Sequence, residues 1–152
     1  MSAQSSSAIV IGGSMAGLLA ARVLSNHYDR VTIIERDKLP DTPEYRNGTP
    51  QARHLHTLLA HGQRLLEQLF PGIEDDFDKA GATKLRWGLD TATRITGGWI
   101  KNYDAGLSSH VLSRITLEWI VRQRVGAIPN ISIIPQQQVN HLLSNADKSA
   151  VI

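Results

Sequence analysis

The sequence predicts an α/β fold built around a parallel βαβ unit, and three neighbouring segments carry that prediction. An uninterrupted apolar run from Ala8 to Ile11 has the branched side chains of a strand buried on both faces. Apolar residues then recur at helical spacing after a glycine-rich turn. A second apolar run starts at Val31 and ends in the carboxylate of Glu35. Strand, turn, helix and strand in this order predict two parallel strands joined by a crossover helix.

The helix between these strands is predicted to begin at Ser14, where the apolar spacing changes. Its buried face consists of residues three or four positions apart, namely Met15, Leu18, Leu19 and Val23. Ala16 and Ala20 are small enough to allow close packing on a sheet. Asn26 and His27 are expected to close the helix before the second strand.

A long loop and two helices are predicted after the second strand. Residues 36–51 are polar and rich in proline, and unstructured loops of this length are usually functional or disordered. A leucine stripe then predicts a helix from about His54 to Phe70, which a Pro-Gly pair ends. The leucines of this stripe are Leu55, Leu58, Leu59, Leu65, Leu66 and Leu69. A short acidic helix is expected from Ile73 to Ala80, ended by Gly81.

Antiparallel strands are predicted in the second half of the chain, before it returns to the parallel sheet. Residues 82–90 and 94–104 have the pattern of an antiparallel pair with glycine bulges. A strand at 108–112 and a helix at 114–125 lead to a buried strand at 131–134. We therefore expect a Rossmann-like βαβ domain with added antiparallel strands.

The two ends of the chain carry separate expectations. Residues 1–7 are predicted to be a short disordered leader, followed by one domain over residues 8–152. Residues 138–145 and 149–152 indicate the beginning of a hairpin. Because the sequence ends within this apolar pattern, we expect a domain that is incomplete at its C-terminus and belongs to a larger fold.

The composition excludes several classes of function. A net charge of +2 over 152 residues gives no electrostatic case for binding nucleic acid or an anionic membrane. The absence of cysteine excludes disulfides and thiolate chemistry and is typical of a reducing cytoplasm. The first seven residues lack the basic charge of a signal peptide, and the uncharged run after them is too short to span a membrane. We therefore expect a cytoplasmic protein without a membrane span.

The glycine-rich turn resembles the fingerprint that binds the pyrophosphate of a dinucleotide. The six positions of that fingerprint are Gly12, Gly13, Ser14, Met15, Ala16 and Gly17, with serine in place of the middle glycine. Gly12 permits a tight turn out of the strand, and Gly17 allows the helix to lie close to the sheet. Ser14 is small enough for a phosphate to approach, and its hydroxyl can cap the helix or donate to the phosphate. The alternative is a sharp turn that uses glycine for backbone reasons alone.

Glu35 favours the dinucleotide interpretation over that alternative. It lies 18 residues after Gly17 and ends the second strand, close to the offset expected for an acid that binds the ribose. Its charge also argues against a ribose 2′-phosphate. The fingerprint does not separate FAD from NAD, but the chain after Glu35 departs from the repeated βα units of a simple NAD domain, and this departure favours a flavoprotein.

Five segments resemble the N-terminal region of FAD-dependent oxidoreductases of the p-hydroxybenzoate hydroxylase type, also called 2-polyprenyl-6-methoxyphenol hydroxylase-like monooxygenases. The segments are VIGGSMAGLLAARVL, VTIIERD, GTPQARHLHTLL, LFPGI and VLSRITLEWIVRQRV. The resemblance covers nearly the whole chain. It implies a monooxygenase or hydroxylase that acts on a small organic substrate, with FAD as cofactor and NAD(P)H as reductant.

The resemblance also implies roles for particular residues. The glycine turn would contact the pyrophosphate, Glu35 the adenosine ribose, and Arg36 would lie beside the adenine. Arg53 would contact a phosphate near the flavin, and Arg114 would lie near the FAD phosphates. A cation in the first turn of a helix is unfavourable unless an anion offsets it, which supports this role for Arg114. The alternative for Arg114 is an exposed side chain that hydrogen-bonds a neighbouring loop.

The sequence departs from this family in one motif, and two alternatives to the flavoprotein interpretation remain. The Gly-Asp motif that completes the FAD site in this family is absent from the sequence, and no residue is assigned a catalytic role. No metal site is expected, because His54 and His56 would face apart on a helix.

The alternatives are an NAD-dependent Rossmann dehydrogenase or reductase, and a catalytically incomplete nucleotide-binding or interaction module. The substrate, the oligomeric state and the choice among hydroxylation, halogenation and reduction stay undetermined.

Overall fold

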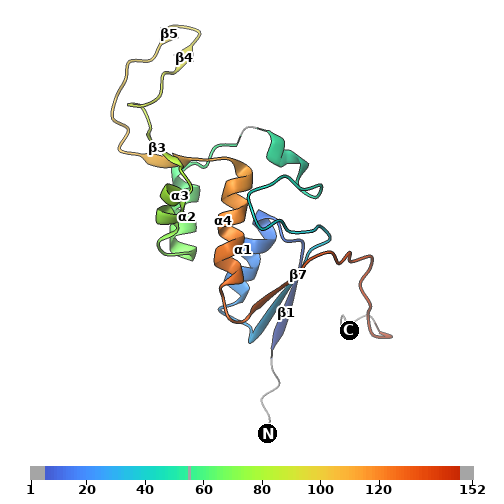
Figure 1. The fold of residues 1–152 in the computed structure, drawn as a ribbon. Coiled ribbons are helices and arrows are strands. Elements are labelled where there is room, and N and C mark those ends of the chain that lie inside the picture. The colour runs from blue at the N-terminus through green and yellow to red at the C-terminus, as the bar shows by residue number, and fades with distance from the viewer. Residues whose placement is uncertain (1–5, 55, 148–152) are drawn as a thin grey trace. The chain divides into compact units, whose positions relative to one another are not determined.

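A computed structural model describes residues 6–54 and 56–147 (Figure 1). Their contacts form two compact units within the expected domain. The first unit comprises residues up to Thr42, Arg46–Pro50 and the residues from Val121 onward. The second comprises Pro43–Tyr45 and Gln51–Ile120. No helix in the described part of the chain is both long and apolar enough to cross a membrane.

The first unit contains the predicted βαβ arrangement. Strands β1 (Ser7–Ile11), β2 (Arg30–Ile34) and β7 (Ile131–Ile134) form a parallel sheet in the order β1-β2-β7. Helix α1 (Met15–Leu24) connects β1 to β2 and packs against both strands. The predicted α/β class, the crossover helix and the addition of a C-terminal strand, β7, to the sheet are therefore confirmed.

One face of this sheet forms the core of the first unit. Val10, Val31 and Ile33 are buried on it, together with Leu18 and Ala21 of α1. The apolar run at β1 predicted burial on both faces, and this was wrong for the described residues. Side chains alternate along a strand, so the neighbours of Val10 point to the opposite face. Those neighbours are Ile9 and Ile11, which are 66% and 58% exposed.

The second unit contains helices α2 (Ala60–Leu69) and α3 (Ile73–Lys79), which pack around Leu66, Phe70 and Phe77. Helix α3 matches the predicted acidic helix, whereas α2 begins six residues after the predicted start at His54. A 3₁₀ turn, η1 (Pro50–Arg53), and extended residues precede α2 instead. The predicted leucine stripe is buried only in part, because Leu66 is buried whereas Leu59 and Leu65 are 62% and 45% exposed. The first residue of a helix depends on the local backbone, which the leucine spacing does not specify. Leu55 lies outside the described residues.

The antiparallel strands of this unit pair differently from the prediction. Strand β3 (Thr83–Arg86) pairs with β6 (Ser108–Val111), and not with the segment that follows it in sequence. Strands β4 (Arg94–Ile95) and β5 (Gly98–Trp99) instead form a separate short hairpin. The prediction paired nearest neighbours in sequence, which is the commonest arrangement but not a rule.

The C-terminal elements agree with the prediction only in part. Helix α4 (Arg114–Gly126) and β7 lie where they were expected. The hairpin expected from residues 138–145 and 149–152 stays a prediction, because the described residues 135–147 contain a single bridge at Ser144 and no strand, and the second half of the hairpin is not among them. The other half of that hairpin, residues 149–152, lies outside the described residues.

Candidate functional site

The turn that leaves β1 requires glycine at two positions. Gly12 has a φ of +98°, in the region that favours glycine, and its amide donates to the Ile34 carbonyl at 2.8 Å. A Cβ atom at Gly17 would overlap the carbonyl oxygen of Gly12. The two roles predicted for these glycines, a tight turn and a close approach of the helix, are both observed.

Ser14 is the N-cap residue of α1 and has an extended backbone. Its carbonyl accepts the Leu18 amide at 2.9 Å, but its hydroxyl makes no capping hydrogen bond. The first turn of α1, which begins at Met15 and Ala16, contains no acidic residue. The N-terminal amides of a helix lack partners within it and carry partial positive charge, so this end of α1 has the character of an anion site.

Glu35 directly follows β2 and contacts the glycine turn. It is only 4% exposed, and its Oε2 accepts the Gly13 amide at 2.7 Å. Its Oε1 accepts the Asp37 amide at 2.9 Å. A Cβ atom at Gly13 would lie 3.3 Å from Glu35 Cβ, so a side chain there would crowd the acid. The acid and the turn, which the sequence paired by spacing alone, are in direct contact.

Arg46 is a residue of this site that sequence reasoning missed. Its Nη1 lies 3.2 Å from Glu35 Oε2 and 3.0 Å from Asp37 Oδ2. Its Nη2 donates to the Gly13 carbonyl at 3.2 Å, and its side chain is 5% exposed. Asp37 Oδ2 also accepts the Gly48 amide at 2.6 Å. The polar loop was expected to be functional or disordered, and nothing in the sequence of the loop distinguished Arg46 from the other arginines.

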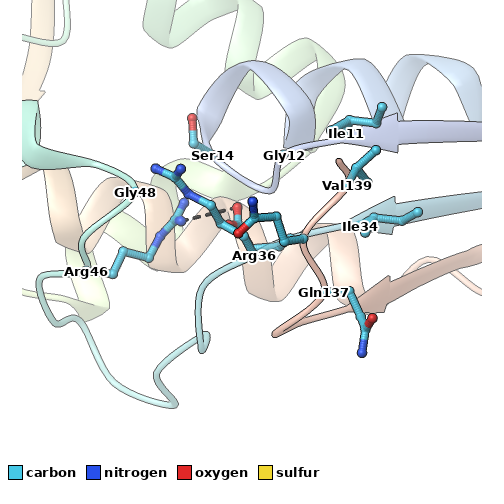
Figure 2. A pocket seen from close by; sticks show the side chains of 11 residues that line it. Ile11, Gly12, Ser14, Ile34, Arg36, Arg46, Gly48, Gln137 and Val139 are labelled. Atoms are coloured by element: carbon cyan, nitrogen blue, oxygen red, sulfur yellow. Dashed lines mark ion pairs between the residues drawn. The ribbon is translucent and has the colours of Figure 1, made fainter. Parts of the chain in front are cut away.

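These residues surround a cavity of about 360 Å³ in the first unit (Figure 2). This volume lies within the range of small-molecule sites. Four predicted site residues line it: Gly12, Ser14, Glu35 and Arg36. The remaining lining residues are Ile11, Ile34, Arg46, Gly48, Gln137, Gln138 and Val139. The other predicted residues of the fingerprint, Gly13, Met15, Ala16 and Gly17, belong to the turn and to the first turn of α1.

The segment after β7 forms another part of the cavity wall that the sequence did not reveal. The Gln137 amide donates to the Glu35 carbonyl at 2.9 Å, and the Gln136 amide donates to the Asp37 carbonyl at 3.1 Å. Gln136 has a φ of 59°, which turns the chain at this point. These bonds join segments about a hundred residues apart, and neither segment carries a pattern that predicts the other.

The two other predicted arginines belong to the second unit. Arg53 is exposed, and its guanidinium lies 4.6 Å from the centre of the Tyr45 ring. Arg114 is the first residue of α4. Its Nε is buried and has no hydrogen-bond partner within the described chain. A buried N–H without an acceptor is costly, so this atom fits a site that receives an acceptor from an anionic ligand.

No three His, Cys, Asp or Glu side chains gather as a metal site among the residues described. His54 and His56 were argued to face apart on a helix, and that argument was wrong in its premise. Both residues precede α2, and the Nδ1 atom of His56 lies 2.9 Å from the His54 carbonyl oxygen.

A parallel βαβ unit whose glycine turn, helix N-terminus and buried acid meet at one cavity defines a Rossmann-like nucleotide-binding fold. No protein-family model matches the chain. A curated relative is Protein Rv3254 of Mycobacterium tuberculosis, which is 42% identical over 131 residues. The match covers 84% of this chain and 28% of Rv3254.

Solved structures of flavoproteins share the fold. PqsL of Pseudomonas aeruginosa, a probable FAD-dependent monooxygenase, matches 97% of this chain and 36% of its own, with a TM-score of 0.65 and 14% identity. The oxygenase of 2-methyl-3-hydroxypyridine-5-carboxylic acid matches 99% and 38%, with a TM-score of 0.63 and 22% identity. The flavin-dependent halogenase CmlS matches 91% and 24%, with a TM-score of 0.59 and 21% identity. The chain therefore has the fold of the FAD-binding region of flavin-dependent monooxygenases, and at the level of the fold the predicted resemblance is confirmed.

Proposed function

We propose that residues 8–152 form the FAD-binding domain of a flavin-dependent oxidoreductase, and that the cavity of the first unit binds the ADP half of FAD. One observation carries this proposal. The buried carboxylate of Glu35 contacts the glycine turn at the N-terminus of α1. An acceptor for ribose hydroxyls and donors for a pyrophosphate thus lie at one cavity, as dinucleotide binding requires.

The proposed contacts follow from the chemistry of each group. Backbone amides at the start of α1 and the Ser14 hydroxyl donate to the pyrophosphate, while Gly12 keeps the approach free of side chains. Glu35 accepts from the adenosine ribose, and Arg36 lies beside the adenine. The cavity wall at Gln137–Val139 adds backbone groups and an apolar side chain for the base.

For Arg53 and Arg114, which belong to the second unit, the resemblance to flavoproteins suggests contacts with phosphate oxygens. The unsatisfied Nε of Arg114 supports this role, because an anionic oxygen would give that buried donor an acceptor. Arg53 presents an exposed guanidinium that lies 4.6 Å from the centre of the Tyr45 ring.

The reaction of the whole protein is proposed by likeness to its relatives. We infer oxygenation of a small organic substrate with NAD(P)H as reductant, since PqsL is a probable FAD-dependent monooxygenase. The flavin, when bound, supplies the redox chemistry, and the residues described here bind and orient it. The same fold occurs in a halogenase, so the reaction class rests on the wider likeness and not on this site.

The visible absorption spectrum of the purified chain, recorded after incubation with excess FAD and desalting, tests the proposal. We expect a retained flavin band, and a much weaker band for Glu35→Ala. Arg30→Gln, an exposed arginine at the far end of β2, is the matched control and should retain the band.

Each contrary outcome favours one of the alternatives. Absence of the band together with NAD binding in calorimetry would favour an NAD-dependent dehydrogenase or reductase. Absence of binding to FAD, NAD and ADP in a folded chain would contradict the nucleotide site and favour an interaction module.

A further inference from the structure

The two carboxylate oxygens of Glu35 have unequal surroundings. Oε2 accepts the Gly13 amide at 2.7 Å and has the Nη1 atom of Arg46 at 3.2 Å. Oε1 has one described partner, the Asp37 amide at 2.9 Å. One oxygen therefore has a backbone donor and a cation beside it, and the other has a single backbone donor.

Arg46 is held in this position by contacts on several sides. Its guanidinium pairs with Asp37 Oδ2 at 3.0 Å and donates to the Gly13 carbonyl at 3.2 Å. Asp37 is in turn fixed by the Gly48 amide at 2.6 Å. The dashed ion pair in Figure 2 shows Arg46 reaching from its loop toward the end of β2. Burial of a guanidinium is costly unless its charge is paired and its N–H groups are hydrogen-bonded, and these contacts of Arg46 provide both.

The number of acceptor positions on Glu35 decides what it can offer to a ligand. An ionised carboxylate has about four acceptor positions, two on each oxygen. On Oε2, the Gly13 amide occupies one position, and the Arg46 guanidinium, whose Nη1 forms an ion pair with this oxygen at 3.2 Å, stands in the way of the other. On Oε1, Asp37 occupies one. A single acceptor position therefore remains for a ligand, and it lies on Oε1.

We propose that Arg46 is a positioning residue that determines how the ribose is recognised, by reserving Oε2 of Glu35 and leaving Oε1 to accept one ribose hydroxyl. This inference rests on the proposed function, because it assumes that the adenosine ribose lies at Glu35. The affinity for the nucleotide then depends on one of the two ribose hydroxyls and not on the other. Arg46 acts through Glu35 in this arrangement.

Titration calorimetry of the full 152-residue chain with ADP, 2′-deoxy-ADP and 3′-deoxy-ADP tests the inference. One deoxy analogue should bind the wild-type chain at least about tenfold more weakly than ADP, since a hydrogen bond to a charged group is lost. The other analogue should bind within about twofold of ADP, because its missing hydroxyl has no acceptor on Glu35.

Three variants separate this role from general support of the fold. Arg46→Gln frees a position on Oε2, so both deoxy analogues should then bind more weakly than ADP. Arg46→Lys keeps the charge beside Glu35 and should restore the wild-type pattern in part. Arg30→Gln is the same chemical change at an exposed arginine of β2 and should keep the wild-type pattern. The ratio between analogues is the readout, because loss of stability weakens all three ligands alike.

The outcomes distinguish the inference from the function on which it rests. Equal losses for both analogues in the wild-type chain would overturn the inference while leaving ADP binding intact. An Arg46→Gln variant that keeps the wild-type pattern would overturn the role of Arg46. A wild-type chain that does not bind ADP would contradict the proposed function, and the inference would fall with it.

Discussion

The Gly13 amide donates to the Glu35 carboxylate at 2.7 Å, across 22 positions of sequence. This bond joins the glycine turn after β1 to the residue that ends β2. Its consequence is that the turn proposed to bind the pyrophosphate and the acid proposed to bind the ribose are already held together. Preorganisation of this kind lowers the ordering cost of binding.

Glu35→Ala should weaken FAD binding by about tenfold to a hundredfold, because a hydrogen bond to a charged acceptor is removed. Ser14→Ala should weaken it by only a few-fold, since the α1 amides remain to bind the phosphate. Fluorescence titration with FAD measures both. Glu35→Gln keeps an oxygen for the Gly13 amide and controls for damage to the turn. Equal losses at Glu35 and Ser14 would contradict the ribose assignment.

Gly17→Ala should destabilise the chain by about 1–3 kcal/mol or more, because the new Cβ would overlap the Gly12 carbonyl oxygen. Gly62→Ala is the matched control within helix α2. Its Cβ would meet Leu58 Cδ1 at 3.4 Å, an ordinary contact, so it should stabilise the chain by about 0.5–1 kcal/mol. Urea unfolding followed by circular dichroism measures both. An unchanged free energy of unfolding in Gly17→Ala would show that α1 can move away from the turn.

Gln63→Leu should lower the free energy of unfolding by about 1–3 kcal/mol, because it leaves buried polar groups of the second unit without hydrogen-bond partners. Gln63 Oε1 accepts the backbone amide of His110 at 2.7 Å, and its Nε2 donates to Glu74 at 2.8 Å. His110 is 1% exposed, so water cannot replace the lost partner. Arg64→Leu, at an exposed neighbouring position of α2, should change the free energy of unfolding by less than about 0.5 kcal/mol. Similar losses in the two variants would argue against the buried network.

Asp90 should make the chain pH-sensitive in acid. Hydrogen bonds from Arg86 lower the pKa of the Asp90 carboxyl from 3.8 to about 2. Because this pKa is lower in the folded chain, ionised Asp90 stabilises the fold above pH 3.8, and that contribution disappears as the pH falls toward about 2. Carboxyl-detected NMR titration measures the pKa directly.

Asp90→Asn provides the control for that titration. The variant should lose the part of the acid-induced change in stability that lies between these two pH values. Because the pair is exposed, added salt should reduce the effect. A titration midpoint for Asp90 near its ordinary value would show that the Arg86 contact does not persist in solution.

Local patterns predicted the elements whose cause is local. Apolar runs located β2 and β7, helical spacing located α1, and the sequence also predicted α3 and α4. The spacing from Gly17 to Glu35 predicted an acid beside the turn, and the two are in contact. The errors fell where a tertiary partner decides the outcome. The pairing of β3 with β6 and the exposed face of β1 depend on neighbours that are distant in sequence.

The sequence by itself determined the α/β class, the glycine turn, the crossover helix and the position of Glu35, because each follows from backbone sterics or from the period of a strand or helix. The tertiary structure alone decided that Arg46 lies against Glu35 and that Gln137–Val139 line the cavity. These contacts join segments whose approach depends on the path of the whole chain. A charged side chain in a polar loop has no periodic pattern, and only the folded chain reveals which partner it meets.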